Sequence, residues 1–154
     1  MTDENQDNTA QQDPSVSVLK VYMKDCSFEA PNTPEIFNGT DKEPEIEVSL
    51  GYSASQLDDN LHEVVLTVTV TAKMGDKSMY LVEVHQAGIF EFIGFDEELL
   101  NTAIGVWCPT QLYPYAREVI CNLTAKGGFM PLLLDHQNFE TIYEQNQSQD
   151  ETQH

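Results

Sequence analysis

Residues 28–37 read Phe-Glu-Ala-Pro-Asn-Thr-Pro-Glu-Ile-Phe and combine two prolines with three large apolar side chains. Proline lacks a backbone donor, fixes its own φ and pushes the preceding residue towards extended geometry. This stretch therefore fits neither a central strand nor a helix, and it is more apolar than an ordinary short connection. We predict a stiff crossover that either lies over another part of the chain or is covered by a partner.

Four stretches around the crossover have the alternation of β-strands. The first carries apolar residues on both faces, which suits a strand covered on both sides or paired across a subunit boundary. Gly75 is predicted to turn the hairpin between the last two strands, and Gly88 predicts a bend or bulge. The predicted strands are Val16–Phe28, Glu45–Tyr52, Leu61–Ala72 and Ser78–Ile93. Their predicted core residues include Val64, Leu66, Val68, Val70, Tyr80, Val82 and Val84.

Helix signals follow the strand signals, so the chain is predicted to be α+β rather than a series of βαβ units. Asp96 is placed to cap a short helix over Glu97–Ile104. The main helix is predicted to open at Pro109 or Pro114, because proline is tolerated in a first helical turn. An apolar stripe on it predicts either core packing or a helix interface between subunits. The stripe consists of Leu112, Ala116, Val119, Ile120 and Leu123.

A last short helix is predicted over Asp135–Glu144, capped by Asp135. Polar, apolar-poor stretches flank the ordered region and are predicted to be disordered. The chain thus divides into a tail over 1–15, a single domain over 16–145 and a second tail over 146–154.

The charge of the chain is −19, from 26 acidic and seven basic residues. Nucleic acid is excluded as a partner, because phosphate contacts need lysine and arginine. The negative charge suits either a basic partner or general solubility. Three cysteines without metal-type spacing, no signal peptide and no apolar run of membrane length predict a soluble cytoplasmic protein that does not insert into a membrane.

No motif for enzymatic chemistry stands out. The glycines form no phosphate-binding loop, and the histidines form no metal-ligand array, so neither a cofactor nor a metal is expected. Of the three cysteines, Cys108 is the candidate for a reactive thiol, because it lies just before a predicted helix start and a helix dipole would stabilise its thiolate. A small packing residue is the favoured interpretation, and the chain is not expected to be an enzyme.

Several motifs resemble those of SecB, the bacterial protein-export chaperone family. They are residues 22–32 (Tyr-Met-Lys-Asp-Cys-Ser-Phe-Glu-Ala-Pro-Asn), residues 80–90 (Tyr-Leu-Val-Glu-Val-His-Gln-Ala-Gly-Ile-Phe), Cys108-Pro109, residues 113–118, residues 128–131 and Asn138-Phe139. The resemblance covers about residues 18–143, with all motifs in order.

This resemblance implies a four-stranded antiparallel sheet with a Greek-key crossover, followed by helices packed on one side and assembled as a dimer of dimers. It also implies an ATP-independent holdase that keeps presecretory proteins unfolded and passes them to the SecA motor. The residues that match the family's groove for unfolded polypeptide are Phe28, Ile36, Phe37, Phe139 and Tyr143. Those that match the interface between dimers are Tyr113, Ala116, Val119, Ile120 and Leu123.

The family's SecA-binding surface matches Asp25, Glu29, Leu81 and Glu83. The family commonly carries an aromatic residue before the second strand, whereas Asn38–Glu43 has none, so one side of the groove is expected to differ. Two other functions are weighed: a SecB-like chaperone for another cargo system, such as a toxin–antitoxin pair, and a thiol enzyme that uses Cys108.

Overall fold

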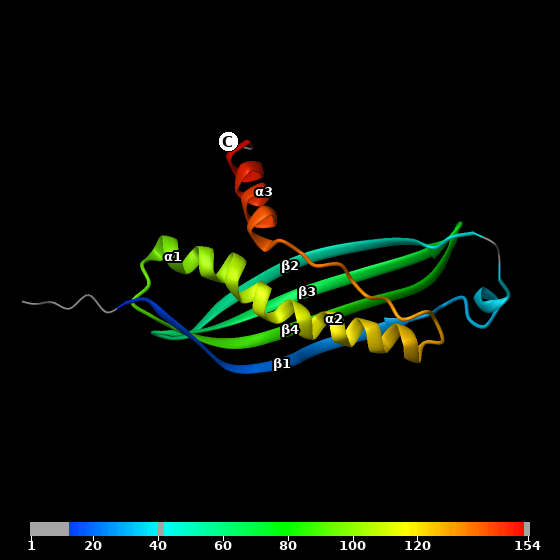
Figure 1. The fold of residues 1–154 in the computed structure, drawn as a ribbon, viewed down its shortest axis with the longest axis horizontal. Helices are drawn as coiled ribbons and strands as arrows, with labels where there is room; N and C mark the ends of the chain where they lie inside the picture. Colours follow the sequence, from blue (N-terminus) through cyan, green and yellow to red (C-terminus); the bar gives the residue numbers. More distant parts are fainter. Residues whose placement is uncertain (1–12, 40–41, 153–154) are drawn as a thin grey trace, which may run out of the picture.

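This computed structural model describes residues 13–39 and 42–152. Four antiparallel strands form one sheet in the order β1-β4-β3-β2, and helices α1 and α2 run across one face of it (Figure 1). The strands are β1 (Ser15–Glu29), β2 (Glu45–Asp58), β3 (Leu61–Met74) and β4 (Lys77–Ile93). Because β1 and β2 lie at opposite edges, the segment between them, with the short 3-10 helix η1 (Glu35–Phe37), crosses one end of the sheet. The predicted α+β fold with its crossover is confirmed.

The sheet buries the alternating side chains that the sequence assigned to the core. All seven predicted core residues of β3 and β4 are at most 3% exposed. The hairpin at Gly75, with a φ of 60°, is also confirmed. β2 is longer than predicted, because it pairs with β3 from Glu45 to Asp58 and only residues 59–60 turn. The hydrogen bonds between the two strands of a hairpin join backbone groups, so pairing continues through residues whose side chains do not alternate.

Gly88 forms no bulge, contrary to the prediction. It pairs in register with Val21 on β1 and with Val64 on β3. A β-carbon at this position would lie 3.2 Å from the side chain of Leu112 on α2, and closer still to the ring of Phe90. The glycine therefore allows the helix to pack closely on the sheet, and the irregularities of pairing between β1 and β4 lie in β1 instead.

Helices α1 (Glu97–Thr102) and α2 (Cys108–Lys126) are joined by a π-helical segment, η2 (Ala103–Trp107). The side chain of Asp96 caps α1 by accepting a 2.7 Å hydrogen bond from the backbone amide of Leu99, as predicted. Pro109 lies in the first turn of α2, as predicted for one of the two prolines, although π-helical backbone precedes it, whereas Pro114 lies inside the helix. The π-helical turn changes the backbone ladder before Pro109, where the chain lacks an amide donor.

The last helix, α3 (Phe139–Thr152), begins later and ends later than predicted. Its first turn is capped by Asn138, whose Oδ1 accepts hydrogen bonds from the backbone amides of Glu140 and Thr141, so the prediction of Asp135 as the cap is wrong. The helix includes residues 146–152, which the sequence placed in a tail. Glutamine and glutamate are good helix formers and extend a helix that packing has already started. Of the predicted tails, residues 1–12 and 153–154 lie outside the described part of the chain.

Candidate functional site

Four aromatic side chains from three parts of the chain meet where the crossover returns to the sheet. Phe28 is the second-last residue of β1, Phe37 ends η1, Tyr80 lies on β4 and Phe129 follows α2. The ring of Phe129 lies 5.0 Å from that of Tyr80 and 5.2 Å from that of Phe37, and Phe28 stacks on Tyr80 at 5.9 Å. We call these four residues the aromatic cluster. Such offset and tilted pairs stabilise one another beyond their burial.

The aromatic cluster is partly open to solvent. The side chain of Phe37 is 48% exposed, and Phe28 and Ile36 are half-buried. Gly127 and Gly128 bring the end of α2 against the cluster, because a β-carbon on Gly127 would overlap the Phe28 ring and Gly128 has a φ of 86°. Two of the predicted polypeptide-binding residues, Phe28 and Phe37, therefore belong to one partly accessible aromatic cluster, and Ile36 precedes Phe37 in η1.

The other two predicted polypeptide-binding residues lie apart from this cluster, on α3. Phe139 is only 5% exposed and packs edge-on against Tyr113, with ring centroids 5.7 Å apart, so it anchors α3. It also lines a cavity at the start of α3. Tyr143 is half-buried over Gly105 in η2, beside the hydroxyl of Tyr52. Any side chain at Gly105 would collide with the Tyr143 ring. The absence of a side chain at Gly105 thus leaves room for the Tyr143 ring where α3 packs on η2.

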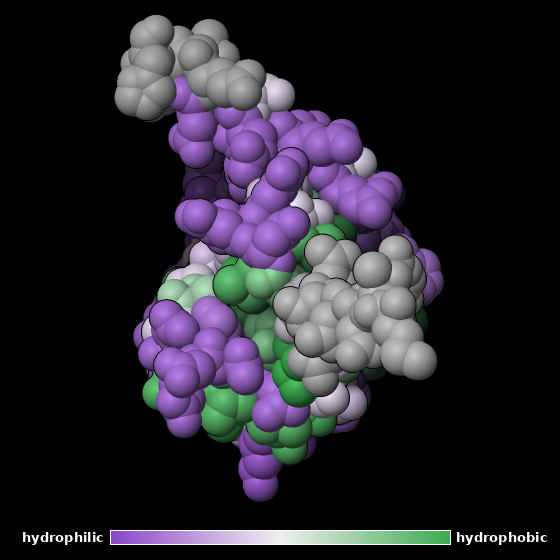
Figure 2. Space-filling model, turned by 90° about the vertical axis from the view of Figure 1, so that its left-hand side faces the viewer, coloured by the Kyte–Doolittle hydropathy of each residue, from purple (hydrophilic) through white to green (hydrophobic). Residues whose placement is uncertain are grey.

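Two apolar features of the surface were not predicted. Met130 and Leu133, on the segment that links α2 to α3, are 88% and 75% exposed. A cavity of about 610 Å³ also opens between η2 and the start of α3, and Phe95, Leu99 and Trp107 are among its lining residues. The end view in Figure 2 shows hydrophobic surface gathered below the hydrophilic α3. In the sequence, only the motif at residues 128–131 pointed to the linking segment.

The predicted SecA-binding residues come together on the sheet face opposite the helices. On β4, Leu81 and Glu83 alternate with buried valines, and their neighbours on β1 are Glu29, opposite Leu81, and Ser27, opposite Glu83. Asp25 lies two residues before Ser27 on β1 and pairs with His85 on β4. Because side chains of paired residues share a face, Leu81, which is 37% exposed, lies on the same face as the carboxylates of Asp25, Glu29 and Glu83.

Further along the same face, Glu63 joins β3 to β1. Its carboxylate accepts hydrogen bonds from the Tyr22 hydroxyl and, at 2.8 Å, from the Lys24 ammonium. These bonds hold the pKa of Glu63 below its ordinary value, with the Lys24 bond contributing most. The pKa of Tyr22 is raised to about 12, mainly by burial and further by the neighbouring Glu63 carboxylate. The bonds fix the edge strand β1, next to the acidic surface, in one register.

Cys108 is in no position to react. Its side chain, on the first residue of α2, is fully buried, and burial raises the pKa of its thiol to about 12. Helical backbone precedes it, so the expected free helix start is missing. Within residues 13–39 and 42–152, no three His, Cys, Asp or Glu side chains are placed to hold a metal ion. None of the helices described is long and apolar enough to cross a membrane.

The predicted interface stripe on α2 is divided between core and surface. Tyr113, Ala116 and Ile120 are at most 4% exposed within one chain, and the Tyr113 hydroxyl donates a 2.6 Å hydrogen bond to the carbonyl of Asp135. The core alternative is therefore confirmed for Leu112, Ala116 and Ile120, all fully buried. Of the predicted interface residues, Val119 and Leu123 keep partial exposure.

Comparison with known proteins gives a consistent result. Residues 9–150 match the family model described as SecB, preprotein translocase subunit SecB. The protein-export protein SecB of Nitrosococcus oceani is 50% identical over 134 residues, which cover 86% of this chain and 82% of the relative. That of Hydrogenovibrio crunogenus is 46% identical over 143 residues, which cover 93% and 91%.

Among solved structures, a SecB-like chaperone of Mycobacterium tuberculosis in complex with an antitoxin peptide has the same fold. The TM-score is 0.61 at 17% sequence identity, and the match covers 80% of this chain and 91% of that one.

Proposed function

The chain belongs to the SecB family, and on this basis we propose that it is an ATP-independent holdase chaperone that binds unfolded presecretory polypeptides and delivers them to the SecA motor. The observation that carries the proposal is the aromatic cluster, because partly exposed aromatic side chains held by a stiff crossover suit the binding of extended apolar segments. The relatives at 41–50% identity are named for protein export.

An unfolded segment would lie on Phe28, Ile36 and Phe37 and extend over Met130 and Leu133, whose exposure leaves them free for such contact. No covalent step is involved. Each contact can be weak, since linked sites on one assembly raise the effective concentration for the next contact. Tyr143 and the buried Phe139 would contribute by fixing α3, the helix that follows the segment carrying Met130 and Leu133.

The assembly we propose is a homotetramer, a dimer of dimers. β1 is a long edge strand, and three of its large apolar side chains are 42–52% exposed, namely Val18, Leu19 and Met23. The unpaired backbone groups of such an edge strand can form hydrogen bonds with a strand of a second subunit. The two dimers would meet on the outer side of α2, where Tyr115 is 52% exposed and Val119 and Leu123 are half-buried.

The acidic surface around Leu81 is proposed to receive SecA in the cytoplasm. Asp25, Glu29 and Glu83 would attract a basic segment of the motor and accelerate encounter, and Leu81 would supply an apolar contact. Such an interaction weakens with added salt. It would leave the helix-covered side of the sheet free for cargo.

The holdase activity is tested by diluting a denatured protein into buffer that contains the full chain and no nucleotide. Light scattering should stay low at a molar excess of the chaperone. Aggregation at the rate of the buffer control would reject the proposal.

The SecA assignment is tested by charge reversal. Glu83→Lys should reduce SecA affinity in low salt, whereas Glu47→Lys, a change on the opposite edge strand, should have little effect. If Glu83→Lys binds SecA as the wild type does, Glu83 is not part of the SecA-binding surface. If the wild type suppresses aggregation but does not bind SecA, the chaperone serves another cargo system.

A further inference from the structure

His85 lies among the carboxylates of the surface proposed to receive SecA. It is two residues after Glu83 on β4, and it pairs with Asp25 on β1. Alternate residues of a strand and paired residues of neighbouring strands share a face, so all three side chains lie on the face opposite the helices. The side chains of His85 and Glu83 are 32% and 45% exposed. The imidazole is therefore open to solvent, with one carboxylate beside it and another on the neighbouring strand.

Two polar contacts hold the imidazole of His85 in place. Its Nδ1 lies 3.2 Å from the hydroxyl oxygen of Thr67 on β3, and its Nε2 lies 3.7 Å from Oε1 of Glu83. The Thr67 hydroxyl can donate to an unprotonated Nδ1 or accept from a protonated one, because a hydroxyl rotates to suit its partner. The same position of the ring therefore suits both the neutral and the charged imidazole.

A proton on His85 changes the charge of the acidic surface at this point. The charged imidazole forms an ion pair with the Glu83 carboxylate at 3.7 Å, and it lies on the same face as Asp25. The neutral imidazole leaves both carboxylates to a basic segment of a partner. The two charge states of His85 therefore differ in their attraction for such a segment.

The other charged groups around His85 belong to β1 and β3. On β3, His85 pairs with Thr67, whose neighbours on this face, Val65 and Thr69, are uncharged. Further along, Glu63 of β3 and Lys24 of β1 neutralise each other at 2.8 Å. Glu83 and Asp25 are thus the carboxylates that face the imidazole among the residues that the structure describes, and Glu29 lies beyond them on β1.

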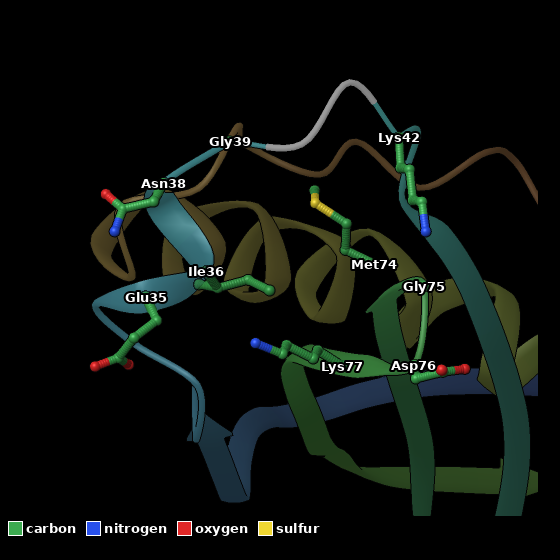
Figure 3. A pocket seen from close by; sticks show the side chains of 9 residues that line it. All are labelled: Glu35, Ile36, Asn38, Gly39, Lys42, Met74, Gly75, Asp76 and Lys77. Carbon is green, nitrogen blue, oxygen red and sulfur yellow. The ribbon is translucent and has the colours of Figure 1, made fainter.

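Lysines do not provide a positive charge that responds to pH near neutrality, because they stay charged throughout that range. Lys42 and Lys77 line a hollow between η1 and the β3–β4 hairpin together with Glu35 and Asp76, so groups of both signs belong to it (Figure 3). An imidazole, in contrast, changes its charge between about pH 5 and 8. On the acidic surface, His85 supplies this property.

We propose that His85 sets the affinity of the acidic surface for SecA according to pH. The neutral imidazole leaves Glu83 and Asp25 to a basic segment of the motor, whereas the imidazolium pairs with Glu83 and repels that segment. Binding of SecA therefore weakens as pH falls below neutrality, while the carboxylates themselves stay ionised. This inference rests on the proposed function and adds regulation of the same surface to it.

The test measures the dissociation constant of the full chain for purified SecA by isothermal titration calorimetry, at about pH 8 and about pH 6 in low salt. SecA changes its own charge over this range, so each variant is compared with the wild type against the same SecA. Between the two pH values, the wild type should lose about 3-fold more affinity than His85→Gln, which cannot titrate; this is the scale of one exposed ion pair.

Two further variants separate charge from other effects of the substitution. His85→Lys carries a permanent positive charge and should bind SecA about 3-fold more weakly than the wild type at about pH 8. His136→Gln is the matched control, because His136 lies on the segment between α2 and α3, beside Arg117 at 3.5 Å. This variant should lose affinity on acidification as the wild type does.

Equal losses of affinity in the wild type and in His85→Gln would overturn the role of His85 alone, and so would wild-type affinity of His85→Lys at about pH 8. If the wild type binds no SecA at either pH, the proposed delivery to SecA fails, and the role of His85 fails with it.

Discussion

Replacing Phe37 by alanine gives the sharpest test of the aromatic cluster. This ring is 48% exposed, so its loss should weaken polypeptide binding more than it lowers the stability of the fold. A phenylalanine side chain offers roughly 200 Å², so about 100 Å² would be covered on binding. At about 25 cal/mol per Å², and allowing for the retained β-carbon, the loss is about 2 kcal/mol. We therefore expect about 30-fold weaker binding of an unfolded polypeptide.

The assay is anisotropy of a labelled, permanently unfolded polypeptide titrated with the full chain, with thermal melting measured in parallel. Phe37→Ala loses mainly its contact with Phe129, which costs about 1 kcal/mol and lowers the melting temperature by about 2–4 °C. Leu57→Ala is the control, since Leu57 is 53% exposed on β2, outside the cluster. Unchanged affinity in Phe37→Ala, or an equal loss in Leu57→Ala, would refute the assignment.

Three further predictions concern the framework of the site. Glu63→Gln should lower the free energy of unfolding, measured by chemical denaturation at neutral pH, by about 1–2 kcal/mol. Because the pKa of Glu63 is lowered in the folded chain, its contribution is full above the ordinary value of 4.5 and disappears as pH falls through the lowered pKa. A difference between wild type and variant that stays unchanged in acid would contradict this. Gly105→Ala should displace Tyr143 and speed hydrogen exchange in α3 while β3 stays protected; unchanged exchange would show that the helix docks without this contact. Cys108 should resist alkylation near neutral pH until the chain is unfolded, and rapid labelling of the native protein would contradict its burial.

The sheet and its core were predictable because a half-buried strand imposes a period of two on its sequence. Val64, Val68 and Val82 follow that period and are fully buried. The crossover was predictable from its prolines for an equally local reason. In contrast, the register of β2 beyond Tyr52 depends on backbone pairing with β3, which leaves no mark in the side-chain pattern.

The residues that form the site were harder to predict from the sequence. The sequence indicated Phe28 and Phe37 through the crossover, but the meeting with Tyr80 and Phe129 is a tertiary contact between residues far apart in the chain. Burial of Phe139 likewise depends on Tyr113, another helix's residue, and could not be read from the apolar face of α3 alone. Periodicity says which residues share a face, but it does not say which face another element covers.

The alternation of β4 links the two proposed binding surfaces. Tyr80 faces the helices and joins the aromatic cluster, whereas Leu81, the next residue, faces the opposite side and lies among the carboxylates. β1 repeats the arrangement, since Phe28 faces the cluster and Glu29 pairs opposite Leu81. Consecutive residues of a strand point to opposite faces, so one sheet keeps the sites adjacent in sequence and separate in space. A motor on the acidic face need not compete with the polypeptide for contacts, and transfer must then depend on the motor drawing the polypeptide away.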